Sequence, residues 1–232
     1  MSMLAMSQFL QDYGSDIIRL TGDHLVLTFM AVAIAAALAV PTGVLLAMCP
    51  WRRFSNVMLG IVNIFQPIPS LAMVALAGAL FIFLKEKLGW GFLRSTGFAP
   101  GLVALVAYAL LPIIRNTYTG VRQVDDTIVE VAMGMGMKRV QVLFRVQLPL
   151  AVPFILAGLR IATVWTIGTA TLVSLIGASS LGGLIFTGIA RSRISLILAG
   201  AIPAIILAMV FDLFLGATER RLTPDENIIN TK

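Results

Sequence analysis

Hydrophobic residues in this chain form long runs that short charged segments separate. Residues 25–49, 57–84, 98–114 and 194–211 contain no charged side chain, and 146–190 contain only Arg160. An α-helix needs about 20 residues to cross the roughly 30 Å hydrocarbon layer of a membrane. The run 146–190 is too long for one crossing, and its glycine-rich stretch before residue 184 predicts that a helix ends there and a return segment follows.

We therefore predict an all-α, polytopic transmembrane helical bundle of about five spans. The composition supports this fold class, because 59% of the residues are hydrophobic and only 12% are charged, a balance that excludes a water-soluble domain. The membrane domain is expected over 24–221, with a charged segment at 122–148 between the third and fourth spans. The predicted spans are 24–49, 56–84, 98–116, 149–175 and 195–217.

The distribution of Lys and Arg predicts the orientation of the bundle. The side that holds the 122–148 segment has Arg52, Arg53, Arg122, Lys138, Arg139, Arg145, Arg220, Arg221 and Lys232. The other side has Arg19, Lys85, Lys87, Arg94, Arg191 and Arg193, while Arg115 and Arg160 lie near or within the membrane. This bias of nine against six places the 122–148 segment and the C-terminus in the cytoplasm and the N-terminus outside.

The two ends of the chain are predicted to lie outside the bilayer. Residues 1–23 alternate apolar and charged positions at roughly helical spacing, which predicts a short extracytoplasmic helix on the membrane surface. Residues 222–232 are predicted to be a polar cytoplasmic tail. His24, near the start of the first span, is interpreted as an interfacial residue, and the single Cys49 excludes an intramolecular disulfide.

No motif for catalysis or cofactor binding is found in the sequence. The Gly-Met-Gly at 134–136 follows no predicted strand and lacks the Lys-Ser/Thr that a phosphate-binding loop supplies. Neither a metal-ligand spacing nor a nucleophile with a base is present. We therefore expect no enzyme activity and no cofactor in this chain. The net charge of +6 is attributed to membrane topology and not to nucleic-acid binding.

The segment between the third and fourth spans predicts two short helices that meet at an angle. Asp125 and Asp126 can cap the first helix, whose apolar residues recur at helical spacing and which carries Glu130 on another face. Gly134 and Gly136 permit a sharp joint. A second short helix follows, and Pro149 opens the next span, where its missing N–H is harmless.

The sequence VEVAMGMGMKRVQVLFRVQLP at 129–149 resembles the coupling loop of binding-protein-dependent ABC importer permeases. The family pattern is E-A-A, three residues, G, nine residues, I, one residue and L-P. The chain meets this pattern with the same spacing, at Glu130-Val131-Ala132, Gly136, Val146 and Leu148-Pro149. Two of these residues, Val131 and Val146, are mild departures from the pattern. The resemblance covers nearly the whole chain and implies the type I ABC importer permease fold.

The resemblance implies a transport subunit of an ATP-driven importer in the bacterial cytoplasmic (inner) membrane. Two permease subunits, identical or paralogous, would form the pathway, and an extracytoplasmic binding protein would deliver the substrate. Separate cytoplasmic ATPase subunits would bind ATP and Mg, and a cleft in each would receive one coupling loop. The expected ATPase-coupling residues are Glu130, Ala132, Gly134, Gly136, Leu148 and Pro149.

Three further stretches, at 65–76, 129–137 and 167–185, resemble permeases of the osmoprotectant importers that carry glycine betaine, choline, carnitine and related quaternary amines. Aromatic side chains typically hold such cations by cation–π attraction. We expect that aromatic cage in the binding protein, because a permease needs only a weak and transient path.

Candidate pathway residues lie in the second and fourth spans. In the second span, two prolines leave backbone carbonyls unpaired, which is tolerable only against protein or a water-lined cavity; a packed kink is the alternative. In the fourth span, a polar strip fits either pathway lining or hydrogen bonding between helices. The candidates are Gln66, Pro67, Pro69, Trp165, Thr166 and Thr169.

Arg160 is the residue whose charge has the highest free-energy cost of insertion in the predicted membrane region. It lies about 16 Å along a helix from Pro149, near the middle of the bilayer. Asp212 lies at a comparable depth on the antiparallel fifth span, about 12 Å from Arg220. We predict that Arg160 and Asp212 form a buried ion pair, with snorkelling of Arg160 toward the cytoplasm as the alternative.

Two other function classes fit a polytopic membrane protein. A secondary transporter would use Arg160 and Asp212 as coupling residues and would have inverted repeats or proton-linked acids, neither of which is evident in the sequence. A membrane assembly subunit without transport would have no use for a pathway.

Overall fold

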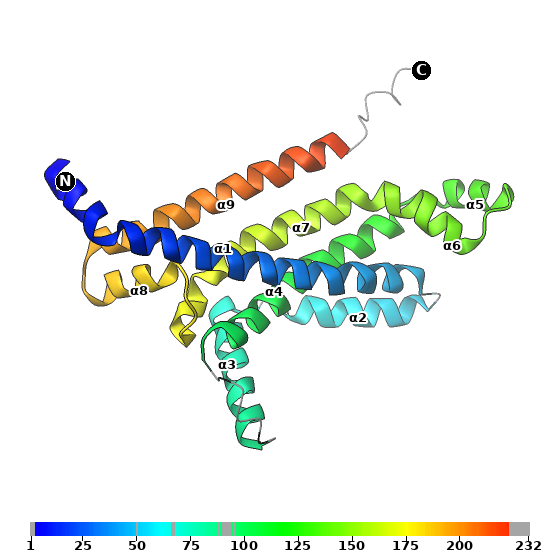
Figure 1. The fold of residues 1–232 in the computed structure, drawn as a ribbon. Coiled ribbons are helices and arrows are strands. Elements are labelled where there is room, and N and C mark those ends of the chain that lie inside the picture. Colours follow the sequence, from blue (N-terminus) through cyan, green and yellow to red (C-terminus); the bar gives the residue numbers. More distant parts are fainter. Residues whose placement is uncertain are drawn as a thin grey trace.

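The chain folds into an elongated bundle of helices (Figure 1). The computed structural model describes residues 3–49, 51–65, 68–87, 89, 94 and 96–222. Its longer α-helices are α1 (Met3–Met48), α2 (Arg52–Phe65), α3 (Ser70–Lys87), α4 (Phe98–Arg122), α7 (Leu148–Ala170) and α9 (Ile194–Leu222). The shorter elements are α5 (Asp126–Gly134), α6 (Arg139–Val142), the π-helical turn η1 (Leu143–Gln147), the 3₁₀ turn η2 (Leu172–Ile176) and α8 (Gly182–Ala190).

The core lies where α4 packs between α1 and α7. One cluster of buried residues joins the three helices, and its members are four alanines and one isoleucine: Ala35, Ala39, Ala109, Ala162 and Ile113. Small side chains let helix backbones approach closely in a membrane protein. At Gly43, for example, an added Cβ would lie only 2.7 Å from the side chain of Thr117. Close contact between these helices therefore forms the rigid centre of the bundle.

Four helical stretches among the described residues are long and apolar enough to cross a membrane, one fewer than predicted. They are Tyr13–Met48, Phe98–Arg122, Arg139–Ala170 and Ile194–Leu222. The predicted second span, 56–84, is divided between α2 and α3, which have 14 and 18 residues. Figure 1 shows α3 leaving the bundle at a steep angle to α2.

The break in the second span follows from its prolines. A proline lacks the N–H that the helix needs and disfavours helical backbone in the residue before it. Helix α3 accordingly begins at Ser70, immediately after Pro69. Gln66 and Pro67 lie outside the described residues, so their predicted place in the pathway stays a prediction.

The N-terminal segment is continuous with the first span, which differs from the separate surface helix predicted over 1–23. Helix α1 is 46 residues long and contains Gly14 and Gly22 in its first half, neither of which ends it. At a rise of about 1.5 Å per residue, a helix of this length extends well beyond a roughly 30 Å hydrocarbon layer. The predicted polar tail lies outside the described residues, except for Leu222.

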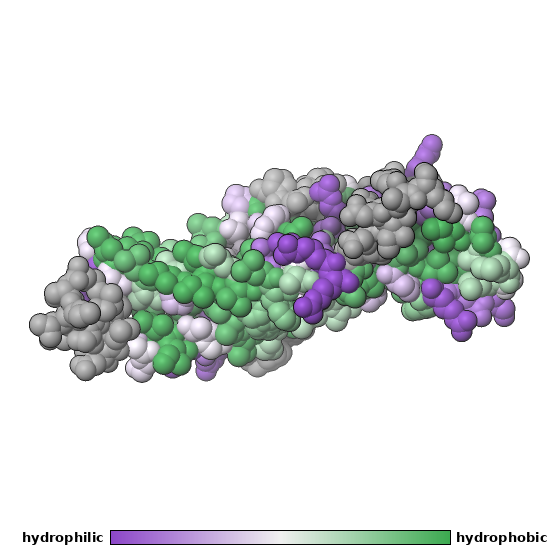
Figure 2. All heavy atoms as spheres, turned by 90° about the horizontal axis from the view of Figure 1, so that it is seen from above, coloured by the Kyte–Doolittle hydropathy of each residue, from purple (hydrophilic) through white to green (hydrophobic). Residues whose placement is uncertain are grey.

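The two ends of the bundle differ in what they carry. One end holds α5 and α6, and the C-terminal end of α9 points toward it, whereas α8 and the beginning of α1 lie at the other end (Figure 1). Hydrophobic side chains cover the length of the molecule, and polar ones gather at the C-terminal end of α9 and toward the α5–α6 end (Figure 2). The predicted return segment is confirmed, since α7 gives way to η2, a left-handed Gly177 and then α8.

Candidate functional sites

The segment between α4 and α7 folds as two short helices joined by a tight turn, as predicted; its residues 125–142 are called the knob below. Asp125 caps α5, because its carboxylate accepts a hydrogen bond from the backbone N–H of Thr127 at 2.8 Å. That backbone hydrogen bond favours the ionised form and holds the pKa of the Asp125 carboxyl below its usual value. The cap therefore fixes where the knob begins.

Gly136 makes the turn that ends α5. Its φ of +87° lies in the left-handed region that residues with a Cβ avoid. The N–H of Met137 donates to the carbonyl of Ala132 at 3.2 Å, and that of Gly136 donates to the carbonyl of Met133 at 2.9 Å, which together form a Schellman motif. Gly134 differs from the prediction, since it is the last residue of α5 and has no positive φ. The joint therefore depends on Gly136 alone.

The second half of the knob runs without a break into α7, whereas the sequence predicted that Pro149 opens a new helix. Proline cannot donate the N–H that would continue an α-helical ladder. The hydrogen-bond pattern changes in the turn before Pro149. There the N–H of Leu148 donates to the carbonyl of Leu143, five residues earlier, which is a π-helical hydrogen bond. The second helix of the knob and α7 are therefore one continuous helical rod.

The knob exposes apolar side chains that a water-facing loop would not keep exposed. Ala132 is buried against the protein, with 3% of its surface exposed, while Glu130 is exposed on the outer side. The exposed apolar residues of the knob are Ile128, Val131, Met133, Met135 and Val140. An apolar surface around an exposed acid is typical of a site for another protein.

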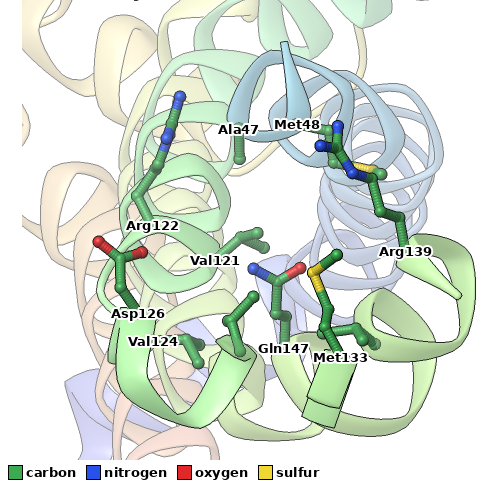
Figure 3. Close-up of a pocket in the computed structure, with 11 residues that line it drawn as sticks. Ala47, Met48, Val121, Arg122, Val124, Asp126, Met133, Arg139 and Gln147 are labelled. Carbon is green, nitrogen blue, oxygen red and sulfur yellow. The ribbon is translucent and has the colours of Figure 1, made fainter. Parts of the chain in front are cut away.

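A pocket of about 350 Å³ lies between the knob and the ends of α1 and α4 (Figure 3). Arg122 of α4 and Arg139 of α6 stand on opposite sides of it, and Gln147 and Met133 point toward its middle. Arg122 also donates a hydrogen bond to the carbonyl of Cys49, at 3.5 Å. The inner side of the knob thus faces a hollow, which leaves room for the knob to shift.

The structure brings Arg160 and Asp212 together. Arg160 Nε donates to Asp212 Oδ1 at 2.7 Å and Nη2 donates to Oδ2 at 2.9 Å, so the pair is bidentate. The guanidinium also donates to Glu219 Oε2 at 3.3 Å. It is therefore held by α9 and does not snorkel. The side chains of Arg160 and Asp212 are 35% and 40% exposed in the single chain, so the pair is only half-buried and not buried as predicted.

An open pocket of about 400 Å³ lies beside the C-terminal half of α7. Trp165 and Thr169 of the predicted pathway line it, together with Tyr108 of α4 and Ser70 at the start of α3. The start of α3 and the polar strip of the fourth span therefore meet at one place, whereas Pro69, another predicted pathway residue, is not among the residues that line this pocket. Thr166, by contrast, is fully buried and donates to the carbonyl of Ala162, so it does not line this pocket.

Comparison with known proteins identifies the family. Residues 39–224 match the model of the family described as "Binding-protein-dependent transport system inner membrane component". The chain belongs to this family. It is a transmembrane permease subunit of an ABC importer, and the matched region includes both the knob and the Arg160–Asp212 pair.

Three relatives match the chain over almost its whole length. The carnitine transport permease protein OpuCB of Listeria monocytogenes is 43% identical, over 96% of this chain and 95% of the relative. The glycine betaine/carnitine/choline transport system permease protein OpuCB of Bacillus subtilis is 40% identical, over 96% and 95%. The choline transport system permease protein OpuBB of the same species is 41% identical, over 94% and 93%.

Solved structures of ABC transporters have the same fold as this permease. An inward-facing MetNI methionine ABC transporter chain aligns with a TM-score of 0.76 at 22% identity, covering 96% of this chain and all of that chain. A chain from an amino acid ABC transporter crystallised with histidines aligns with a TM-score of 0.73 at 21% identity, covering 95% and 99%. The predicted type I importer permease fold is therefore confirmed.

Sequence reasoning about this permease missed several contacts. Glu219 and Gly216 of α9 follow Asp212 at helical spacing, and that spacing could have placed them beside Arg160. The interpretation of His24 as an interfacial residue was wrong, since its ring is fully buried and Nε2 lies 3.1 Å from the carbonyl oxygen of Ile167 on α7. Tyr108 gave no signal, because it is one aromatic residue within an apolar helix.

Proposed function

We propose that this permease forms half of the translocation pathway of an ATP-driven importer for quaternary-amine osmoprotectants. The observation that carries the proposal is the knob, a capped and glycine-closed structure whose exposed side is apolar and whose second helix continues into α7. ATP and Mg bind to separate cytoplasmic ATPase subunits, and this chain contributes no catalytic group.

The coupling residues have distinct roles in this proposal. Ala132 packs the knob against the protein, Gly136 sets the angle of its turn, and Glu130 faces a basic group in the ATPase cleft. Leu148 and Pro149 transmit the movement of the knob to α7 through the π-helical turn. Gly134 is the last residue of α5, and nothing lies within 4 Å of its Cβ position, so it contributes open backbone at the end of this helix.

The knob and the C-terminal end of α9 lie on the cytoplasmic side in this proposal, and the N-terminus lies outside. The positive charges predict this orientation. The C-terminal end of α9 points toward the end that carries the knob (Figure 1), as expected if both lie on one side of the membrane. A binding protein then docks at the opposite end. Such a protein would deliver its cargo near α8 and the C-terminal end of α7.

A second permease subunit, identical or paralogous, completes the pathway. The single chain leaves polar groups half-exposed within its spans, including Arg160, Asp212 and Trp165. Charged side chains within spans almost always face a bundle interior or a water-filled cavity and not lipid. Arg160 and Trp165 lie on α7 and Asp212 lies on α9, and all three line one pocket. We place the pathway and the second subunit on the side of α7 and α9 that carries these groups.

The substrate class comes from the relatives. Their names refer to carnitine, choline and glycine betaine. All three compounds carry a trimethylammonium group, so we propose that this permease transports a molecule with that group. The substrate would cross by alternating access. ATP binding and hydrolysis in the ATPase subunits that contact the knobs would open the pathway first to one side of the membrane and then to the other.

Competition for uptake tests the proposed substrate class. The permease is reconstituted into proteoliposomes with its ATPase, its partner permease and its binding protein, and radiolabelled choline, carnitine and glycine betaine are each offered outside with ATP inside. We expect uptake of at least one of the three, with competition by the unlabelled others and none by methionine or histidine. Uptake of amino acids without uptake of any quaternary amine would contradict the proposal.

A further inference from the structure

We propose that Trp165 and Tyr108 form a transient binding site for the trimethylammonium group of the substrate. The site lies in the 400 Å³ pocket beside α7. This inference rests on the proposed function, because it assumes a quaternary-amine substrate. It differs from the earlier expectation that aromatic recognition of the cation is confined to the binding protein.

The rings of Tyr108 and Trp165 lie close together, and Trp165 is partly exposed. The ring centroids of Tyr108 and Trp165 are 6.1 Å apart and the ring planes are tilted by 45°, so the rings form a wedge. Trp165 is 42% exposed. Gly168, one turn further along α7, also lines the pocket, and no atom lies within 4 Å of the position that its Cβ would take. The absence of a side chain at Gly168 leaves space next to the indole ring.

The chemistry of the pocket suits a cation that has no N–H. A quaternary ammonium group cannot donate a hydrogen bond, but aromatic faces attract it within roughly 6 Å of the ring centroid. The hydroxyls of Thr169 and Thr171 already donate to the carbonyls of Trp165 and Gly168, at 2.9 and 2.7 Å. Their protons are therefore directed to the helix backbone, and they have none to offer to an anion in the pocket.

The pocket recognises only one part of the substrate. Its lining residues are Ser70, Tyr108, Val164, Trp165, Gly168, Thr169, Thr171 and Leu172. None of these carries a charge that would bind a carboxylate. Carnitine and glycine betaine differ from choline in having a carboxylate, so we infer that the site accepts all three through the head group that they share. Its volume lies within the roughly 300–1,000 Å³ range of small-molecule pockets.

The position of the site suits a substrate that arrives from outside. Trp165 lies about 25 Å along α7 from Leu148 at the cytoplasmic end and only about 7 Å from Ala170. Trp165 and Val164 also line a second pocket, which contains the Arg160–Asp212 pair and lies toward the knob. A weak site at Trp165 therefore stands at the outer end of a continuous face of α7. Conduction requires binding that is favourable enough for entry and weak enough for release.

Substitution of the aromatic rings tests the site in the reconstituted complex. The rate of choline uptake is measured with choline-loaded binding protein at a concentration below saturation. We expect Trp165→Leu and Tyr108→Leu to lower this rate by roughly 3- to 10-fold, because each removes a cation–π contact. Trp165→Phe should lower it by less, because an aromatic ring remains. Phe29→Leu is the matched control, since Phe29 is 43% exposed, contacts Phe211 and lines none of the described pockets. Uptake by the control should equal that of the unaltered protein.

Fluorinated tryptophans at position 165 separate cation–π attraction from a packing role, because fluorine weakens the negative face of the ring with little change in shape. We expect uptake to fall stepwise with each added fluorine at position 165 and to stay constant when the same series is placed at Trp51, which is 76% exposed. A flat series at position 165, in a complex whose unaltered form imports choline, would overturn this inference and leave the proposed function intact. Absence of quaternary-amine uptake by the unaltered complex would overturn both.

Discussion

Arg160 on α7 and Asp212 on α9 are joined by two parallel hydrogen bonds, of 2.7 and 2.9 Å. The pair links the fourth and fifth predicted spans at a depth where a single charge would be costly. Gly216, one turn from Asp212, leaves the room that the guanidinium occupies, since an added Cβ there would lie 2.8 Å from Arg160 Cζ. Asp212, Gly216 and Glu219 thus form one face of α9 that receives the arginine.

Removing either partner of this pair should destabilise the permease. We expect Asp212→Asn and Arg160→Gln each to lower the melting temperature in detergent. The expected cost lies between roughly 1 kcal/mol for an exposed pair and roughly 3–5 kcal/mol for a buried one, because the two side chains are half-exposed. The double variant should recover part of the loss, since it removes both charges of the bidentate pair, although Glu219 also loses its contact with Arg160. Simple additivity of the two single effects would contradict a pair that acts as a unit.

Filling the space at Gly216 should disturb the same pair without changing any charge. Gly216→Leu is expected to displace the guanidinium and to lower the melting temperature of the unaltered protein, but to have a clearly smaller effect in the Arg160→Gln background. Gly22→Leu on α1 is the matched control, since no atom lies within 4 Å of the Cβ position of Gly22. Equal destabilisation by Gly216→Leu in both backgrounds would show that the lost stability comes from another contact.

The two glycines of the knob should respond differently to the same substitution. Gly136→Ala places a Cβ at a φ of +87°, at a cost of roughly 1–2 kcal/mol for left-handed backbone, and should reduce transport coupled to ATP hydrolysis. Gly134→Ala lies at the helical end of α5, where alanine is favoured over glycine by roughly 0.5–1 kcal/mol. The measurement is the ratio of substrate imported to ATP hydrolysed in proteoliposomes. A normal ratio in Gly136→Ala would refute the role given to the turn.

Reversing the charge of Glu130 tests the ATPase contact separately from the fold of the knob. Glu130 is exposed, so Glu130→Lys should not destabilise α5, but it should weaken binding of the ATPase by about tenfold or more through repulsion from a basic cleft. The neutral Glu130→Gln is the control, and its binding of the ATPase should lie between that of the unaltered protein and that of Glu130→Lys. Binding is measured by co-purification across a salt series, and the loss should shrink as salt rises. Unchanged complex yield at low salt would remove Glu130 from the interface.

The sequence predicted those features whose signals are local. Hydrophobic runs predicted the helices, the cap at Asp125 and the turn at Gly136 predicted the knob, and matching depths predicted the partner of Arg160. Where tertiary packing determines the local backbone, the predictions differed from the structure. The proline at position 149 was read as a helix start, but a π-helical turn accommodates it within a continuous helix.

Contacts between distant segments that do not join opposite charges gave too little sequence signal. His24 was assigned to the interface from its position near a span boundary, yet it is fully buried and its ring contacts the Ile167 carbonyl of α7. The wedge of Tyr108 and Trp165 requires α4 and α7 to lie side by side in one particular rotation, which no periodicity within either helix determines. Exposure of Trp165 could likewise be judged only after the fold was known.

The most direct test is whether uptake of a quaternary amine depends on ATP hydrolysis by the associated ATPase. The complete complex in proteoliposomes is supplied inside with ATP, with a non-hydrolysable analogue, or with no nucleotide but an imposed proton or sodium gradient. We predict accumulation of radiolabelled choline, carnitine or glycine betaine against its gradient with ATP alone, and lower accumulation when Gly136→Ala replaces the unaltered chain. Accumulation driven by an ion gradient without ATP would contradict an ATP-coupled permease and indicate a secondary transporter in which Arg160 and Asp212 serve as coupling residues.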